Sequence, residues 1–179
     1  MASESEALAY DQLCKSYHAI DDFRAKLLGF LPLATGAGIL FAAKEGPSLL
    51  QRFSPQIAIF GFLITFGLFC YEIYGIRKCF ELIQTGKKIE RALNVQGQFA
   101  TRPHGVFGLI NEPFAAGVIY PAVLASWAFV GFVHMDASQQ FAYSAPQCVA
   151  VLTSAGIFVG GFGFTVMYDR HLGGTEKRQ

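Results

Sequence analysis

Long stretches without a charged residue are the feature that most limits how this chain can fold. Four of them occur, at residues 27–43, 53–71, 113–133 and 137–168. A helix of about 20 predominantly apolar residues crosses a hydrocarbon core about 30 Å thick. Backbone N–H and C=O groups in lipid must bond within their own segment, so such stretches predict membrane-spanning helices.

Composition supports this class and excludes others. Of the 179 residues, 53% are hydrophobic and 15% are charged, which is too apolar for a disordered chain and unusual for a soluble domain. The net charge of +1 gives no field for nucleic acid. Residues 1–26 carry several acidic side chains where a signal peptide would be basic and then apolar. We therefore expect the first apolar segment to remain as a span.

The predicted fold is an all-α, polytopic integral membrane protein with four transmembrane helices. We expect residues 1–26 to form an amphipathic cytoplasmic helix that leads into span one. The transmembrane domain, 27–168, would contain spans at about 27–43, 55–76, 113–134 and 147–168, with a cytoplasmic helical loop at 77–112 and a tail at 169–179. Asn111 is a good helix cap for span three, with Glu112 and Pro113 in its first turn.

The fourteen Lys and Arg residues set the expected orientation. Twelve lie before span one, between spans two and three, or after span four, and only Lys44 and Arg52 lie elsewhere. Cytoplasmic loops carry the excess of Lys and Arg in membrane proteins. Both termini and the middle loop should therefore be cytoplasmic.

Two apolar stripes continue beyond the predicted spans. Their members recur at spacings of three and four: Tyr10, Leu13, Tyr17, Ile20, Arg24, Leu27 and Leu31 in the first, and Ile73, Ile76, Phe80 and Ile83 in the second. The first predicts one long helix entering the membrane, with Arg24 reaching the headgroups through its long side chain. The second predicts a helix that continues to Leu93. The two extensions could bury their stripes against each other or against a second subunit.

Small residues four apart predict close helix packing. Gly156 and Gly160 form one such pair in span four, and Ala34 and Gly38 form another in span one. An alternative for the glycine-rich run 159–163 is a carbonyl-lined ion filter. That pattern is interrupted by an extra glycine and lacks a preceding pore helix, so packing is the favoured interpretation.

A few polar or kinking residues inside the spans are candidates for a pathway or gate: Glu72, Thr35, Thr65, Pro32 and Pro121. Glu72 is the only acidic residue within the predicted spans, and we interpret it as a solvated carboxylate at the interface. The alternative is a proton or cation site, because intramembrane ionisable groups often mark such sites. Proline removes a backbone hydrogen bond and can form a hinge, although static kinks are commoner.

Basic residues of the middle loop could contact anionic lipids: Arg77, Lys78, Lys87, Lys88 and Arg91. A juxtamembrane cluster gains roughly 1 kcal/mol per charge near an anionic surface. The simpler alternative is that these residues only enforce topology.

The sequence contains no phosphate-loop, dinucleotide-binding, metalloprotease or nucleophile-elbow motif. His18 with Asp21 and Asp22 has acceptable metal-ligand spacing, but no further ligand is nearby, so we interpret it as a solvated face. The four cysteines are widely spaced and are expected to be isolated thiols. We expect no catalytic residue, cofactor or metal, and no enzyme activity.

The function expected from these patterns is an oligomeric channel or pore-type transport protein. Four short spans cannot easily enclose a water-filled pathway, whereas a symmetric ring of subunits can. The alternative is a membrane-anchored structural or signalling subunit whose cytoplasmic helices bind a partner protein. Expected partners are the lipid bilayer, further copies of the chain, and anionic lipids or a protein at the cytoplasmic helices.

Overall fold

The computed structural model describes residues 4–44, 47–101, 111–136 and 146–176, with side chains described except at 39, 41–44, 47–54, 133–136, 146–147 and 172–176. These residues form four helices, α1 (Glu4–Lys44), α2 (Pro47–Leu93), α3 (Glu112–Asp136) and α4 (Pro146–Glu176). No strand occurs among them. The prediction of an all-helical fold is confirmed for this part of the chain.

Both long amphipathic helices form as the stripes predict. α1 is one helix that runs without interruption from residue 4 to residue 44, through Pro32. Every member of its predicted stripe is buried or half-buried. α2 continues to Leu93, the predicted end. Asn94 then takes a positive φ of 55°, and the Val95 and Asn94 N–H groups bond the carbonyls of Glu90 and Arg91, which completes a Schellman cap.

The start of α3 is also as predicted. The Asn111 Oδ1 accepts a hydrogen bond of 2.9 Å from the backbone N–H of Phe114, so Asn111 caps the helix. Glu112 lies in the first turn, where its charge complements the helix dipole. The Asn111 amide also donates to Asp169 Oδ2 at 3.1 Å, and this bond ties the start of α3 to α4.

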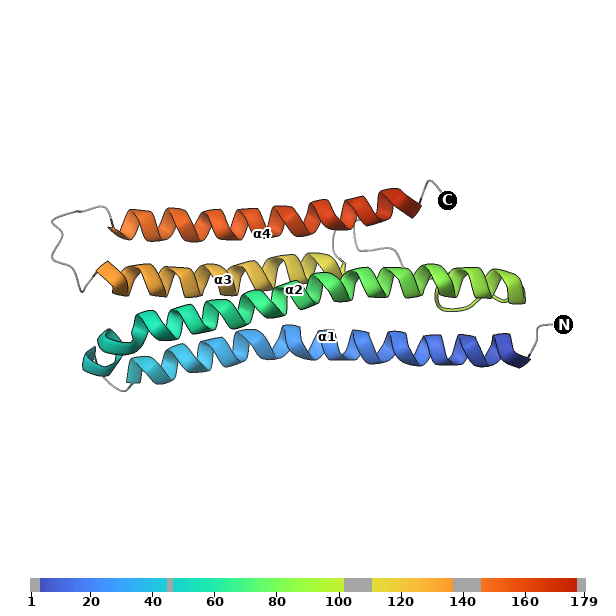
Figure 1. Cartoon of the computed structure of the whole chain (residues 1–179), viewed down its shortest axis with the longest axis horizontal. Helices are drawn as coiled ribbons and strands as arrows, with labels where there is room; N and C mark the ends of the chain where they lie inside the picture. Colours follow the sequence, from blue (N-terminus) through green and yellow to red (C-terminus); the bar gives the residue numbers. More distant parts are fainter. Residues whose placement is uncertain (1–3, 45–46, 102–110, 137–145, 177–179) are drawn as a thin grey trace.

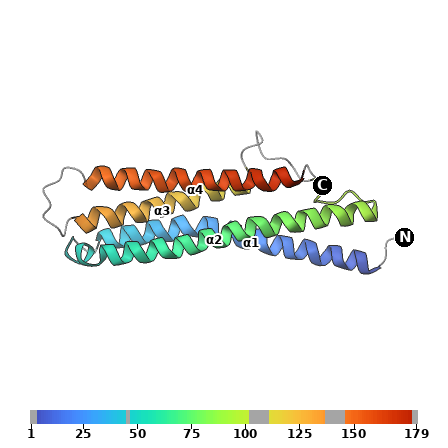
Figure 2. The same ribbon diagram turned by 45° about the horizontal axis from the view of Figure 1, so that its top comes forward.

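The helices follow one another in chain order across the molecule, with α1 and α4 at opposite edges (Figure 1). α2 packs on both α1 and α3, and α3 packs most extensively on α4, while smaller direct contacts join α1 to α3 and α2 to α4. No contact joins α1 to α4 in the described chain, so the helices form an open row rather than a closed four-helix bundle. The start of α1 and the end of α4 lie at the same end of the molecule in both views (Figures 1 and 2).

The beginning of α1 and the end of α2 extend beyond α3 as a two-helix projection (Figures 1 and 2). We call this part the arm; it comprises residues 4–23 of α1 and residues 77–101 of α2 and its following loop. Buried Ile76, Cys79 and Ile83 line the α2 side of the arm and its base. The two apolar stripes are therefore buried against each other, one of the two arrangements that the sequence left open.

Close helix contacts in the row depend on glycines of α2, α3 and α4. A Cβ added to Gly61 would lie 2.4 Å from the Trp127 ring, and one added to Gly161 would lie 2.8 Å from Pro121 Cγ. At Gly117 the nearest atom would be Thr165 Cβ at 3.0 Å. The main buried cluster fills the remaining space, with Leu31, Phe69, Ala116, Tyr120, Val123 and Leu124.

Within the described residues, three helices are long and apolar enough to cross a membrane, in the segments Pro55–Leu93, Glu112–Phe132 and Cys148–His171. Only a minority of residues in these segments is buried inside the chain. Large apolar side chains such as Leu63, Leu152 and Met167 are instead exposed, as expected of a multi-pass membrane protein. The predicted first span, 27–43, lies partly outside the described side chains.

Candidate functional site

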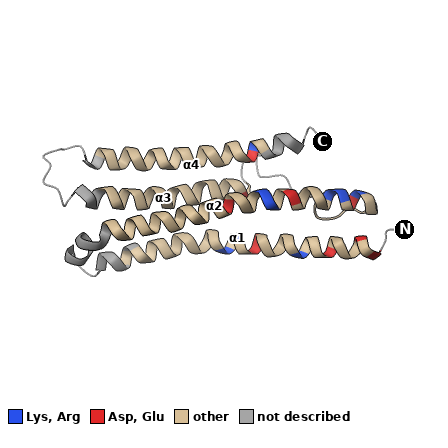
Figure 3. Ribbon diagram, viewed as in Figure 1, with Lys and Arg blue, Asp and Glu red and all other residues tan. Residues whose placement is uncertain are grey.

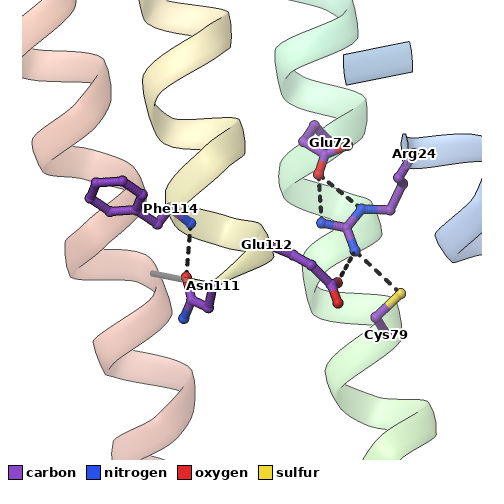
Figure 4. Close-up of polar contacts among 6 residues, drawn as sticks. All are labelled: Arg24, Glu72, Cys79, Asn111, Glu112 and Phe114. Atoms are coloured by element: carbon purple, nitrogen blue, oxygen red, sulfur yellow. Dashed lines mark hydrogen bonds and ion pairs between the residues drawn. The ribbon is translucent and has the colours of Figure 1, made fainter. Parts of the chain in front are cut away.

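A cluster of polar side chains, three of them buried, lies where the arm meets the apolar part of the row (Figure 4). We call it the junction cluster; it comprises Arg24 of α1, Glu72 and Cys79 of α2, and Glu112 of α3. Figure 3 shows that this level divides the molecule: the charged residues gather at the arm end, and the other half of the row carries none among the residues whose side chains are described. The cluster joins three helices at the boundary of their apolar segments.

Arg24 and Glu72 form a fully buried ion pair. The Arg24 side chain is 4% exposed and the Glu72 side chain is 0% exposed. Arg24 Nε donates to Glu72 Oε1 at 2.8 Å, and Arg24 Nη2 donates to the same oxygen at 2.6 Å. Gly75 leaves room for the Arg24 side chain, because a Cβ added at position 75 would lie 3.2 Å from Arg24 Cδ. Burial without the partner would be strongly unfavourable for either charge.

The third nitrogen of Arg24 has two further acceptors. Arg24 Nη1 donates to Cys79 Sγ at 3.6 Å and to Glu112 Oε2 at 3.4 Å. The Glu112 side chain is 44% exposed, so solvent screens its interaction with Arg24. The guanidinium is thus the centre of a contact that includes α1, α2 and α3.

Two buried oxygens of this region lack a hydrogen-bond partner among the described residues: Glu72 Oε2 and the Tyr120 hydroxyl. Both side chains are 0% exposed as residues. Unpartnered buried polar atoms are costly, and each needs a physical reason. The arrangement is an electrostatic connection between helices; among the described residues, no group of three potential metal ligands occurs.

The structure corrects two interpretations of these residues. Glu72 is not a solvated interfacial carboxylate, because it is completely buried and paired. Arg24 does not reach the headgroups, because its side chain turns inward to Glu72. Arg24 is the one charged residue in the predicted α1 stripe, and its side chain is buried together with the apolar members of that stripe. Cys79 is a free thiol, as expected, and its Sγ accepts a hydrogen bond from Arg24.

The other candidate pathway residues do not gather with Glu72. Thr35 donates to the carbonyl of Leu31 in its own helix, and Thr65 is buried. Pro32 is exposed on α1, whereas Pro121 is buried against Gly161. None of these residues contributes to a shared polar channel in the described part of the chain, and their role in gating stays a prediction.

The predicted small-residue pairs face away from the rest of the chain. Gly156, Gly160, Ala34 and Gly38 are all exposed, and a Cβ added at any of the three glycines would meet nothing within 4 Å. These residues therefore do not pack α4 or α1 against a neighbour within the chain. Their use in contacts between chains stays a prediction.

The basic residues of the middle loop do not form one juxtamembrane cluster. α2 is continuous, so Lys87, Lys88 and Arg91 lie roughly 15–21 Å farther along the helix than Arg77 at about 1.5 Å per residue. Arg77 pairs with Glu81 at 3.1 Å and Lys78 is exposed nearby. Contact with anionic lipid stays a prediction for Arg77 and Lys78. If the arm projects away from the membrane surface, Lys87, Lys88 and Arg91 lie farther from the lipid headgroups than the Debye length of about 8–10 Å.

Glu90 organises the far end of the arm. Its Oε1 accepts hydrogen bonds from the Tyr10 hydroxyl at 2.7 Å and the Phe99 N–H at 3.0 Å, and its Oε2 accepts from the Ala100 N–H at 2.7 Å. The loop after α2 therefore folds back onto α2, and the Phe99 ring packs edge-on against Tyr10 and Tyr17 of α1. We call these contacts of Glu90 the arm clasp.

The electrostatics of the arm clasp favour ionised Glu90. Burial opposes ionisation, but the bonds from Tyr10, Phe99 and Ala100 outweigh it and hold the pKa of Glu90 below its ordinary value of 4.5. Burial and the same carboxylate raise the pKa of Tyr10, which stays a neutral donor. Glycine is required at Gly97, where a Cβ would overlap Glu90 Oε1 and the Tyr10 hydroxyl.

Sequence reasoning missed both buried carboxylate sites, although signals for them were present. Arg24 interrupts the apolar stripe just before the predicted span 27–43, and Glu72 lies inside the predicted span 55–76 near its end, so a cation and an acid occur close to the same membrane boundary. Asn94 and Gly97 after α2 are typical of a chain reversal, but the predicted helical loop at 77–112 did not include a return of the chain to Glu90. Residues 102–110 lie outside the described residues.

No protein-family model, curated protein or solved structure matches this chain. The functional conclusion is therefore argued from the geometry alone.

Proposed function

We propose that this chain crosses the bilayer four times, with both ends and the arm in the cytoplasm. The support is the common level at which all four helices change from uncharged to charged residues (Figure 3). Twelve of the fourteen Lys and Arg residues belong to the charged side, and cytoplasmic loops carry this excess. The start of α1 and the end of α4 lie on that side together (Figure 1).

We further propose that the protein is a subunit of a homo-oligomeric membrane pore. The observation that supports this proposal is the open row: α1 and α4 are edges that do not contact each other in the described chain. Each edge exposes small residues, Ala34 and Gly38 on α1 and Gly156 and Gly160 on α4. Two different edges favour a head-to-tail contact, which closes into a ring when the rotation between copies allows it.

The small residues match in depth when the edges of two copies meet. Ala34 follows Arg24 by ten residues and Gly160 precedes Asp169 by nine, which places both roughly 14–15 Å from the boundary at about 1.5 Å per residue. Gly38 and Gly156 are deeper, at roughly 20–21 Å by the same measure. α1 and α4 run in opposite directions, so both pairs can face each other at once. Small residues at matched depth allow two helix backbones to approach closely.

The pathway in this proposal lies between chains, on the axis of the ring. Two of the described polar groups inside the row are used internally, since Glu72 is paired with Arg24 and Thr165 donates to Gly161 of its own helix. A single copy offers no continuous polar route through its described residues. Conduction would therefore require the assembly, and a dissociated chain would be inactive.

Substitution of one small residue tests the assembly and the pore together. Gly160→Leu should abolish the oligomer in membrane-like nanodiscs and the efflux of small ions from proteoliposomes. Gly67→Leu is the matched control, because Gly67 is also an exposed membrane glycine with nothing within 4 Å of its Cβ position. An assembly unchanged by Gly160→Leu would reject the α4 contact. An intact assembly without any efflux would reject the pore.

Cysteine cross-linking tests the head-to-tail arrangement. In a background where Cys70 and Cys148 are serine, Ala34→Cys with Gly160→Cys should cross-link into a ladder of copies that ends at the ring size. Gly160→Cys alone should give little product. A dimer formed efficiently by Gly160→Cys alone would indicate a two-fold α4–α4 contact and would reject the ring.

A second candidate function is a membrane-anchored signalling or structural subunit. The clasped arm favours it, because a rigid two-helix projection held by Glu90 is a suitable surface for a protein partner. Affinity purification from membranes, with the intact arm and with Glu90→Ala, distinguishes the two. A stoichiometric partner lost in Glu90→Ala, combined with absence of efflux, would favour the signalling subunit over the pore.

A further inference from the structure

A pocket of about 340 Å³ lies between the start of α3 and the end of α4. Its lining includes Asn111 and Phe114 from α3, and Phe162, Asp169 and Arg170 from α4. Asp169 and Arg170 are the first charged residues after the apolar segment of α4, and Asn111 begins α3. This inference rests on the proposed membrane position, which places the pocket at the depth of the lipid headgroups.

The pocket wall is apolar on the side toward the membrane. The Phe114 and Phe162 rings meet edge-on at 5.6 Å, and Phe162 stacks on Phe158 at 6.3 Å. These rings fix each other, so the wall is formed before any ligand binds. An apolar wall below a charged rim fits an amphiphile whose chain continues into the bilayer.

The rim carries one charge of each sign. Arg170 is exposed and pairs with no acidic group among the described residues. The adjacent Asp169 is half-buried and is held by the bond from Asn111 to its Oδ2. A carboxylate retains acceptor capacity after one such bond. A guanidinium is well suited to bind a phosphate, and the neighbouring carboxylate to bind an ammonium group.

We propose that this pocket binds a phospholipid whose headgroup joins a phosphodiester to a primary ammonium group, as in phosphatidylethanolamine. Arg170 binds the phosphate, Asp169 accepts hydrogen bonds from the ammonium, and Phe162 contacts the first part of an acyl chain. A purely anionic headgroup is disfavoured because Asp169 repels it. A quaternary ammonium is disfavoured because it has no N–H to donate.

Retention of lipid by the delipidated protein, followed by native mass spectrometry, tests this proposal. Phosphatidylethanolamine, phosphatidylcholine and phosphatidylglycerol with identical acyl chains are added in turn. The wild type should bind phosphatidylethanolamine about tenfold more tightly than either other lipid, as expected for one charge-assisted hydrogen bond. Equal binding of phosphatidylglycerol or phosphatidylcholine would overturn the assignment.

Variants assign the two charges. Arg170→Gln should weaken binding of phosphatidylethanolamine and phosphatidylglycerol alike, whereas Asp169→Asn should remove the preference between them. Lys26→Gln is the matched control, since Lys26 is an exposed cation of α1 near the same boundary, and it should change neither. Loss of binding in Lys26→Gln equal to that in Arg170→Gln would reduce the effect to general surface charge and overturn the proposal.

Asn111→Ser separates direct binding from helix positioning. Serine keeps a capping oxygen for α3 but removes the amide that bonds Asp169. In Asn111→Ser the preference for phosphatidylethanolamine should persist, because Asp169 then has a free acceptor for the ammonium group. Loss of this preference would show that Asp169 acts only by holding α3. Free phosphoethanolamine should not displace the lipid, and displacement at equal concentration would assign the pocket to a soluble ligand instead. Mass spectra resolve lipid bound to single chains from lipid bound to oligomers. The lipid result can therefore be interpreted even if the protein forms no pore.

Discussion

Removal of Arg24 should destabilise the protein more than removal of any other single side chain at the junction cluster. Arg24→Leu leaves the Glu72 carboxylate at 0% exposure, and among the described residues no other cation pairs with it. Breaking a buried ion pair in this way costs about 3–5 kcal/mol. Each 1.4 kcal/mol is tenfold in an equilibrium constant, so the folding equilibrium constant should fall by about two to three and a half orders of magnitude.

Removal of Glu72 should cost less than removal of Arg24. In Glu72→Leu the guanidinium keeps Glu112 Oε2 at 3.4 Å and the Cys79 sulfur at 3.6 Å. Because Glu112 is 44% exposed, its compensation is partial. The double variant Arg24→Leu with Glu72→Leu leaves no uncompensated buried charge, and apolar replacements of buried ion pairs are often neutral or stabilising. It should therefore be more stable than either single variant.

Reversible unfolding in mixed micelles, followed by helical circular dichroism, gives the free energies of all four proteins of this double-mutant cycle. Arg77→Leu is the control, because Arg77 forms an exposed pair with Glu81. Such a pair contributes little to stability, so this variant should change the free energy by less than about 1 kcal/mol. If the two single effects simply add in the double variant, the two charges are not coupled and the reasoning about the junction cluster is wrong.

The remaining predictions concern other contacts. Glu90→Gln should accelerate hydrogen exchange at the Phe99 and Ala100 amides, which lose an ionised acceptor; unchanged exchange would show that the arm clasp does not hold the loop. The pKa of Glu90 is lowered from 4.5, so ionised Glu90 stabilises the arm clasp fully above that pH, and this stabilisation is lost as the pH falls through the folded-state pKa. Hydrogen exchange at the same two amides, measured as a function of pH, should show this loss in the wild type and not in Glu90→Gln. Gly161→Ala should destabilise α3–α4 packing by about 1–3 kcal/mol in thermal unfolding, because its Cβ meets the rigid Pro121 ring. Gly156→Ala should not destabilise, since that position is open, and equal effects at the two glycines would contradict the packing described.

The helices could be predicted from sequence because their signals are local. The α1 stripe needed only the spacing of its apolar residues, and the cap at Asn111 needed only its neighbours in the chain. The end of α2 at Leu93 followed from the continuation of its own stripe. In each case the relevant interactions join residues within a few positions of one another.

The pairing of helices could not be predicted in this way. Gly156 and Gly160 have the spacing of a packing motif, but the structure packs Gly161 and Gly117 instead, because the choice of face depends on the neighbouring helix. Glu72 alone indicates only a costly charge. The burial of Glu72 depends on Arg24, 48 positions away in the chain. The local sequence around either residue does not predict that the two side chains form a pair.

The junction cluster also explains how α1 finds one position along α2. Apolar residues recur on α1 every three or four positions, so a slip of one turn, about 5.4 Å, would still bury an apolar stripe. The same slip would place Ile20 or Leu28 near Glu72 and leave the carboxylate buried without a cation. Apolar contacts are nearly indifferent to the slip, whereas the charge is not, and we infer that the ion pair selects the observed register. Its contribution is then to specificity rather than to net stability, which is the best-attested role of buried polar pairs.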